Sequence, residues 1–430
     1  MTRLLRKRTI VPIVLCMMIG VNLMPVVFGG QNADEEFHQR YDLNAGAVIS
    51  VRNTSGRITI SGWKNNYADL RAVKRGRRTD DFSRVRVDVT NSATRLDIRT
   101  IYDRGRNSVD VDYDINVPFN VIIDSARSNS GDVSVNGVQG YTIAGSNSGT
   151  VDVRNIGDYA KIDTNSGDMQ AVGIKGKVTA SGNSGTIHTR DTGSVTMNMN
   201  SGDLTVTNAA GSVEMHTHSG NVTATQVHGD LIARTSSGDI RTSDITGNAR
   251  LESLSGEVTV DKVTGSVSAN SVSGKVRVTG GSDLIEARST SDDVIITGAK
   301  GRIEASSTSG NLRLENVESA DVTANTTSGD VFFSGVIKDG GRYSFDSFSG
   351  SVRLIFPPGN CGFLLSAKSF NGDIESDYQI KVNEIRQTGT NRRIEGTVGS
   401  GCARVKASSY SGSIFIRSSS NTPNQKKQKN

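Results

Sequence analysis

The stretch NSGTVDVRNIGDYAKIDTNSGDMQAVGIKGKVTA, residues 147–180, carries the pattern that decides the fold. The dipeptide Ser148-Gly149 recurs there as Ser166-Gly167, eighteen residues later. Steps of seventeen to nineteen residues continue this Ser-Gly column through Gly131, Gly149, Gly167, Gly185, Gly202, Gly220, Gly238, Gly256, Gly274, Gly310 and Gly329, with Asp292 in the one vacant position. A repeat of fixed length predicts a stack of equal structural units.

Apolar or small residues occupy the third and fifth positions of each unit, counting the glycine as the first. Within residues 147–180 these positions hold Val151, Val153, Met169 and Ala171. Alternation with a period of two is typical of a β-strand that buries one face and exposes the other.

A second glycine recurs about nine residues after the first, and another alternating pair follows it. Its positions are Gly140, Gly157, Gly176, Gly193, Gly211, Gly229, Gly247, Gly265 and Gly301. Each unit therefore reads as a coil of two short strands joined by two tight turns, where glycine relieves the cost of positive φ. Coils stacked about 4.8 Å apart would pair each strand with its equivalents above and below. We predict an all-β fold, a parallel β-solenoid (β-helix) with about 18 residues per coil.

Composition agrees with a thin, extended core. The chain has 430 residues with 47 Gly and only 6 Pro, and its hydrophobic fraction of 35% is low for one large round core. The formal net charge of +5 is mild for this length and predicts no nucleic-acid partner. The oligomeric state stays open.

The N-terminus has the layout of a secretion signal. Basic residues precede an apolar stretch over residues 10–28 and two glycines end it, namely Arg3, Arg6, Lys7, Arg8, Gly29 and Gly30. We predict a signal peptide over residues 1–30 and export to the periplasm, the cell surface or the medium. The alternative is an uncleaved segment that anchors the protein, although Asn22 and Pro25 interrupt the apolar run.

The repeat divides the rest of the chain into four segments. We expect an irregular N-terminal β cap over residues 31–128, the regular solenoid over 129–331, larger C-terminal coils and a cap over 332–417, and a disordered tail over 418–430. Residues 31–128 alternate as strands but do not keep the period of eighteen.

The C-terminal coils are longer and contain most of the aromatic residues. Ser-Gly-like turns continue at Gly350, Gly372 and Gly412, with steps of 21, 22 and 40 residues. By contrast, the segment 160–331 contains no Phe, Tyr or Trp. Because larger coils need larger fillers and an open end must be covered, we interpret these aromatic residues as core and capping residues.

The Asn residues two positions before the Ser-Gly glycines form another column, at Asn129, Asn147, Asn165, Asn183 and Asn200. Stacked amides can hydrogen-bond along the stack, and Asn tolerates turn geometry well. The alternative is a polar binding stripe.

Cys361 and Cys402 are the two cysteines left after removal of the signal. An even pair in an oxidising compartment can form a disulfide. Cys361 lies eleven residues before Gly372 and Cys402 lies ten before Gly412, and this offset of one residue leaves two alternatives, a disulfide or two free thiols.

One basic cluster stands out, at Arg71, Lys74, Arg75, Arg77 and Arg78. Its functional interpretation is contact with an anionic membrane surface. Its structural interpretation is a solvated loop.

Metal and catalytic chemistry receive little support. Asp follows the turn glycine at Asp132 and Asp168, but other coils place Thr or Lys there, so we interpret this Asp column as turn-forming and expect no calcium. His216 and His218 lack a third ligand in phase, so we expect no zinc or copper site.

Carboxylates that a polysaccharide-acting enzyme would need are scattered along the repeat, as at Asp163, Glu214, Glu252 and Glu304. The middle of the stack also lacks aromatic platforms for sugar rings. We therefore expect no enzyme, no cofactor and no catalytic residue.

With these residues in view, the chain resembles the bacterial DUF4097 family of β-strand-repeat proteins, which are described as candidate adhesins. The resemblance rests on GAVISVRNTSGRITISGW at 46–63, VDYDINVP at 111–118, NSGDVSV at 129–135 and GSGCARVKASSYSGSIFI at 399–416. It implies a right-handed, non-catalytic solenoid at or beyond the cell envelope, with no binding residues to transfer. Cys402 departs from the small residue, such as Gly, that the family pattern leads us to expect.

Two non-enzymatic functions follow as expectations. The first is an adhesin or surface-interaction protein whose long faces bind a ligand that the sequence does not identify. The second is an envelope-associated regulatory or scaffold accessory that docks a membrane protein by edge or face pairing.

Overall fold

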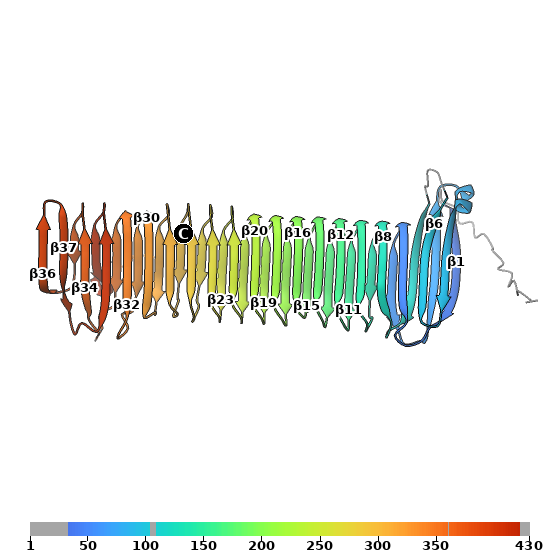
Figure 1. The fold of residues 1–430 in the computed structure, drawn as a ribbon, viewed down its shortest axis with the longest axis horizontal. Helices are drawn as coiled ribbons and strands as arrows, with labels where there is room; N and C mark the ends of the chain where they lie inside the picture. Colours follow the sequence, from blue (N-terminus) through green and yellow to red (C-terminus); the bar gives the residue numbers. More distant parts are fainter. Residues whose placement is uncertain (1–32, 104–108, 360, 422–430) are drawn as a thin grey trace, which may run out of the picture.

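The computed structural model describes residues 33–103, 109–359 and 361–421. Within these ranges the chain forms a long rod of strands that lie across its axis (Figure 1). The predicted fold class is confirmed, since two parallel β-sheets run along the rod and successive strands of the repeat alternate between them. The predicted signal peptide over 1–30 lies outside the described residues. Of the tail that the sequence predicts to be disordered over 418–430, residues 418–421 are ordered as a strand end and a short 3-10 segment, and residues 422–430 lie outside the described residues.

The regular part of the stack consists of two parallel sheets. Sheet A contains β9 (Val133–Asn136), β11 (Val151–Ile156), β13 (Met169–Ile174), β15 (Ile187–Thr192), β17 (Leu204–Ala209), β19 (Val222–Val227), β21 (Ile240–Ile245), β23 (Val258–Val263), β25 (Val276–Thr279), β27 (Val294–Thr297), β29 (Leu312–Val317), β31 (Val331–Gly335) and β33 (Val352–Phe356). Sheet B contains β8 (Ile122–Ser130), β10 (Thr142–Ser148), β12 (Ala160–Ser166), β14 (Val178–Ser184), β16 (Val195–Ser201), β18 (Val213–Ser219), β20 (Leu231–Ser237), β22 (Ala249–Ser253), β24 (Val267–Ser271), β26 (Ile285–Ser289), β28 (Ile303–Ser307), β30 (Asp321–Ser328) and β32 (Arg342–Ser349).

The register between coils follows the repeat. Val151 pairs with Met169 and Met169 with Ile187, so residues eighteen apart lie directly over one another. These inward positions are buried in both sheets and form one continuous core along the rod. The core is filled by side chains and therefore has no open lumen along these columns.

The Ser-Gly glycines are required because consecutive backbones approach closely. A Cβ on Gly238 would lie 2.0 Å from the carbonyl oxygen of Gly220 in the coil before it, which no side chain can tolerate. The second glycine column does not supply the positive φ that the sequence analysis assigns to it. Positive φ falls two or three residues earlier, for example on Asn155 at 54° and Lys262 at 52°.

Polar side chains satisfy the backbone at the Ser-Gly turns. Ser271 Oγ donates to the carbonyl oxygen of Gly256 at 2.9 Å, and Ser or Thr makes the same contact in most other coils. In the Asp column, the backbone N–H of Thr150 donates to Asp132 Oδ1 at 2.9 Å. These carboxylates act in the turns, as the sequence predicts.

At the N-terminal end, the chain does not stack in sequence order. The elements there are β1 (Ala33–Asp42), β2 (Val48–Ser55), β3 (Ile58–Trp63), β4 (Tyr67–Gly76), η1 (Thr79–Arg84), β5 (Val85–Ser92), β6 (Arg95–Tyr102) and β7 (Asp110–Pro118). β2 lies between β6 and β8, and β3 lies between β7 and β9. The segment 48–63, which the sequence analysis places in an irregular cap, is therefore a full coil of the stack.

The C-terminal end is built in a similar way. Its elements are β34 (Phe363–Ser369), β35 (Ile374–Ser376), β36 (Lys381–Thr388), β37 (Asn391–Val398), β38 (Ala403–Ser409), β39 (Ile414–Ser418) and η2 (Ser419–Asn421). The last coil, β38–β39, lies between β32–β33 and β34–β35. The order of turn glycines is thus Gly350, Gly412, Gly372, which differs from their order in the sequence.

Both helices within the described ranges are short 3-10 segments, η1 and η2. Among the residues that the structure describes, no helix is both long and apolar enough to span a membrane.

Candidate functional site

The outer face of β32, β38 and β34 combines charge, hydroxyl groups and exposed aromatic rings, and we call it the C-terminal face. Its strands lie side by side in sheet B because β38 is inserted between the other two. Its outward residues are Arg342, Ser344, Asp346 and Phe348 on β32, Arg404, Lys406, Ser408 and Tyr410 at β38, and Leu364, Ser366, Lys368 and Phe370 at β34.

The insertion of β38 places two arginines next to each other. Arg342 and Arg404 are register partners in neighbouring strands, although 62 positions separate them in the sequence. Arg342 pairs with Asp321 at 3.3 Å, and Arg302 pairs with Glu304 at 2.7 Å. Among the described residues, Arg404 has no carboxylate within ion-pair distance, so its guanidinium remains available.

These cations line an open groove of about 670 Å³. Four cations and one carboxylate contribute to it, namely Arg302, Arg342, Arg404, Lys406 and Asp321. Thr323, Ser344 and Ser366 add hydroxyl groups along the floor. The groove thus has a net positive charge and several neutral hydrogen-bonding groups.

Three aromatic rings form a ladder at the other end of the same strands. Phe348 and Tyr410 stack with centroids 4.8 Å apart, and Tyr410 and Phe370 stack at 4.7 Å. Their exposed fractions are 57%, 45% and 38%, respectively, which is high for rings that the sequence analysis interprets as core or cap. That interpretation holds for buried rings such as Phe333 and Phe345 but is wrong for this ladder.

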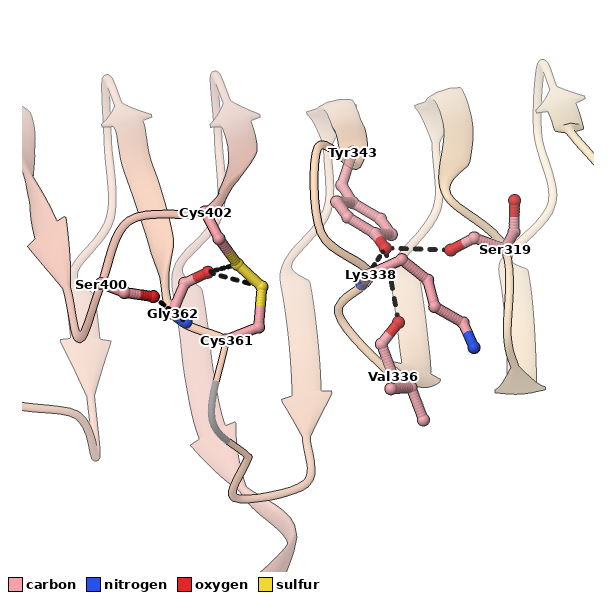
Figure 2. The surroundings of a disulfide bond; sticks show 8 residues. All are labelled: Ser319, Val336, Lys338, Tyr343, Cys361, Gly362, Ser400 and Cys402. Atoms are coloured by element: carbon pink, nitrogen blue, oxygen red, sulfur yellow. Dashed lines mark hydrogen bonds between the residues drawn. A yellow bond between two sulfur atoms is a disulfide. The ribbon is translucent and has the colours of Figure 1, made fainter.

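A disulfide lies just before the C-terminal face along the chain, and Figure 2 shows its surroundings. It joins Cys361, just before β34, to Cys402, just before β38, with Cα atoms 5.7 Å apart. The N–H of Gly362 also donates to Ser400 Oγ at 3.2 Å. Both contacts hold the entry to β38 against β34, and Arg404 follows two residues later.

Tyr343 supports the groove from inside the core (Figure 2). Its hydroxyl donates to the carbonyl oxygen of Ser319 at 2.9 Å and accepts the N–H of Lys338 at 2.9 Å. Burial raises the pKa of this phenol, and the hydrogen bond from Lys338 partly opposes the shift. Tyr343 therefore stays a neutral structural anchor for β32.

The basic cluster of the sequence analysis is partly neutralised. On β4, Arg71 pairs with Glu36 and Lys74 with Glu35, both at 2.8 Å, and Arg75 pairs with Asp112 at 2.8 Å. Arg77 and Arg78 follow β4. Contact of this cluster with an anionic membrane surface stays a prediction, with less available charge than the sequence alone indicates.

The Asn column lies at the Ser-Gly turns, and one bond of the expected amide ladder forms there, from Asn200 Nδ2 to Asn183 Oδ1 at 3.1 Å. The one group of three possible metal ligands within the described ranges is Asp339 with Cys361 and Cys402. Both of its sulfurs belong to the disulfide, so it is a poor metal site as it stands.

The C-terminal face does not follow from the repeat pattern of the sequence. The only signal for it is the position two residues before the turn glycine, where Phe348, Tyr410 and Phe370 all lie. Because that position is exposed in the regular coils, aromatic residues there are not expected to fill the core. Their contact with one another depends on the coil order, which the repeat does not reveal.

The architecture defines the class of protein, a two-sheet parallel β-solenoid with an outward-facing candidate binding surface. The sequence model of DUF4097, described as Toastrack DUF4097, matches residues 173–305 and 283–417, which together exceed half of the chain. The chain belongs to this family. No curated protein matches the sequence significantly.

Three solved structures show similarity. A candidate cell adhesion protein from Clostridium sporogenes ATCC 15579 has 8% identity and a TM-score of 0.17, over 90% of this chain and 99% of that one. A candidate adhesin from Bacteroides fragilis NCTC 9343 has 15% identity and a TM-score of 0.25, over 57% of this chain and 97% of that one. A candidate adhesin from Parabacteroides merdae ATCC 43184 has 8% identity and a TM-score of 0.19, over 68% of this chain and 96% of that one.

Proposed function

We propose that this protein is an exported, non-enzymatic solenoid of the adhesin or surface-interaction type, which binds its partner through the C-terminal face. The observation that carries the proposal is the exposed ladder of Phe348, Tyr410 and Phe370 on the same outer face as Arg404, which has no ion-pair partner among the described residues. Exposed aromatic and arginine side chains are enriched at binding hot spots. A rigid stack of coils supports them without rearrangement.

The state of two carboxylates, Glu214 and Glu252, argues against either of them as a general acid. Asp163 pairs with Arg127 at 2.7 Å, and Glu214 pairs with His216 at 2.9 Å. The hydrogen bond from His216 lowers the pKa of Glu214. Burial raises the pKa of Glu252, but hydrogen bonds from Arg250 and Arg234 outweigh it and lower the value. A general acid needs a raised pKa, so these shifts have the wrong direction.

One observation favours the alternative, an envelope-associated accessory that docks another protein. β36 pairs with β37 on one side only, so its other side is an open edge within the described residues. Val382 and Ile385 on this strand are 44% and 65% exposed. An exposed edge with apolar residues is a template for strand addition by a partner.

Protease treatment of intact cells tests the proposal directly. We expect an added protease to remove the solenoid from the cell surface, as detected with an antibody, while a cytosolic control protein stays intact. Protection in intact cells, followed by degradation once the outer barrier is opened, contradicts outward display and supports the accessory function.

A further inference from the structure

We infer that the C-terminal face binds an anionic polysaccharide, with Arg404 as the main contact for its acidic groups. The inference rests on the proposed function, because it identifies the class of ligand for that face. No comparison assigns a ligand there.

The charge of the groove selects the sign of the ligand. Arg342 is already engaged by Asp321, and Lys406 lies 3.5 Å from Asp346. Arg404 is more than a third exposed and has no carboxylate partner among the described residues. A planar guanidinium binds carboxylate and sulfate oxygens in a bidentate manner, so Arg404 suits an acidic substituent. Arg342, its register partner, adds a second positive charge beside it.

The neutral groups of the face fit a polyhydroxylated chain. Thr323 and Ser344 are register partners on neighbouring strands of the groove, and Ser366 lies in the same outward column two strands further on, beyond Lys406. Hydroxyl groups both donate and accept hydrogen bonds, as sugar hydroxyls require. Because neighbouring strands are about 4.8 Å apart, Thr323 and Ser344 present hydroxyl groups at that spacing, and Ser366 lies on the far side of Lys406.

The aromatic ladder extends the site along the same strands. Phe348, Tyr410 and Phe370 line a second hollow of about 420 Å³ together with Lys368 and Asp346. The planes of neighbouring rings are within 4° of parallel, so each ring covers the face of the next. The ladder therefore offers ring edges and its two end faces to a ligand.

An acidic peptide fits less well than a glycan. A peptide that adds to a sheet needs an open strand edge, whereas β38 is hydrogen-bonded to β32 on one side and to β34 on the other. The face therefore recognises its ligand through side chains alone. Spaced hydroxyl groups beside an arginine match a sugar acid better than a polypeptide backbone.

Calorimetric titration of the purified full chain tests the inference. The probes are oligogalacturonate, which carries carboxylates, a sulfated heparin oligosaccharide, neutral dextran and poly-glutamate. We expect at least one acidic glycan to bind, with affinity that falls as salt rises, and dextran to bind at least tenfold more weakly. The two acidic arms distinguish carboxylate from sulfate recognition.

Arg404→Gln and Arg353→Gln form a matched pair of variants. Arg353 is also exposed and lies on sheet A against the ring of Phe415, at 5.5 Å from its centroid. We expect Arg404→Gln to weaken glycan binding at least tenfold and Arg353→Gln to change it less than twofold, with unchanged circular dichroism for both. Tyr410→Ser should weaken binding at least threefold.

Three outcomes overturn the inference. These are no binding of either acidic glycan, equal losses in Arg404→Gln and Arg353→Gln, or binding of poly-glutamate as tight as that of the glycans. Because this measurement uses purified protein, its failure leaves the protease test of surface display unaffected, and the reverse also holds.

Discussion

Met199 occupies part of the space that a side chain at Gly182 would need in the neighbouring coil. The two residues are register partners in β14 and β16, and a Cβ on Gly182 would lie 3.1 Å from Met199 Sδ. The same Cβ would lie 3.0 Å from Met169 Cε and 3.0 Å from the carbonyl oxygen of Thr164. Both lie in the column where Ser or Thr usually donates to the turn glycine. In these two coils, a packed thioether replaces the hydroxyl contact.

This relationship predicts strong coupling between the two positions. Gly182→Ser alone should destabilise the fold by about 1–3 kcal/mol through overpacking, and Met199→Thr alone by about 1–3 kcal/mol through a cavity. The double variant places a hydroxyl side chain in both coils again. Its loss of unfolding free energy should be smaller, by at least about 1 kcal/mol, than the sum of the losses in the two single variants. Denaturant unfolding of all four proteins measures this coupling, and strictly additive losses would contradict it.

Lys262 is a site where a substitution should stabilise the protein. Its φ of 52° is left-handed, which costs a residue with a Cβ roughly 1–2 kcal/mol. Lys262→Gly should raise the free energy of unfolding by about 0.5–1 kcal/mol, after the entropy cost of glycine. As control, Asn208→Gly should give no gain, because Asn tolerates this region and Asn208 donates to Asp191 at 2.6 Å. A loss of stability in Lys262→Gly would refute the argument.

Gly238→Ala tests the close approach of consecutive turns. Its new Cβ would lie 2.0 Å from the carbonyl oxygen of Gly220, so we expect a loss of about 3 kcal/mol or more, or failure to fold. Gly359→Ala is the control, because its nearest atom is 4.0 Å away. Thermal melting should separate the two variants clearly, and similar melting temperatures would show that the turns can spread.

The disulfide should stabilise the C-terminal coils. Cys361 and Cys402 are 41 positions apart in the sequence. A disulfide that closes such a loop stabilises the folded protein by about 2–4 kcal/mol, because it restricts the conformations of the unfolded chain. We expect Cys361→Ser with Cys402→Ser to expose β38–β39 to limited proteolysis while leaving residues 129–331 protected. Peptide mapping of the native protein under non-reducing conditions checks the bond itself, and two free thiols would end this prediction.

Acid should weaken the ion pairs on the outer face of sheet B. The pKa of Glu252 lies below its ordinary value of 4.5 in the folded protein, so its contribution to stability is present above pH 4.5 and is lost as the pH falls through the lowered value. Glu252→Gln should therefore cost up to about 1 kcal/mol at neutral pH and nothing well below pH 4.5. Melting temperatures across this range test the sign. Asp158→Asn is the control, at a carboxylate with no ion pair among the described residues. The difference in melting temperature between this variant and the unchanged protein should not depend on pH in this way.

The two ends of the molecule show where sequence reasoning reaches its limit. The contact between Gly238 and Gly220 follows from the eighteen-residue step, since each coil stacks on the one before it. The repeat length does not predict that Arg342 and Arg404 are register partners, because the chain forms β34 to β37 before it returns to insert β38. The same return brings Tyr410 between Phe348 and Phe370.

The amino-acid sequence alone determined the strands, the turns, the register and the continuous core over residues 129–331. These features depend on contacts between one coil and the next, which a fixed period reports directly. Only the tertiary structure decided the order of the end coils and, with it, the candidate binding face. The reason is physical: several strands of similar pattern can pair at either end, and packing of whole coils, rather than local spacing, selects which of them are neighbours.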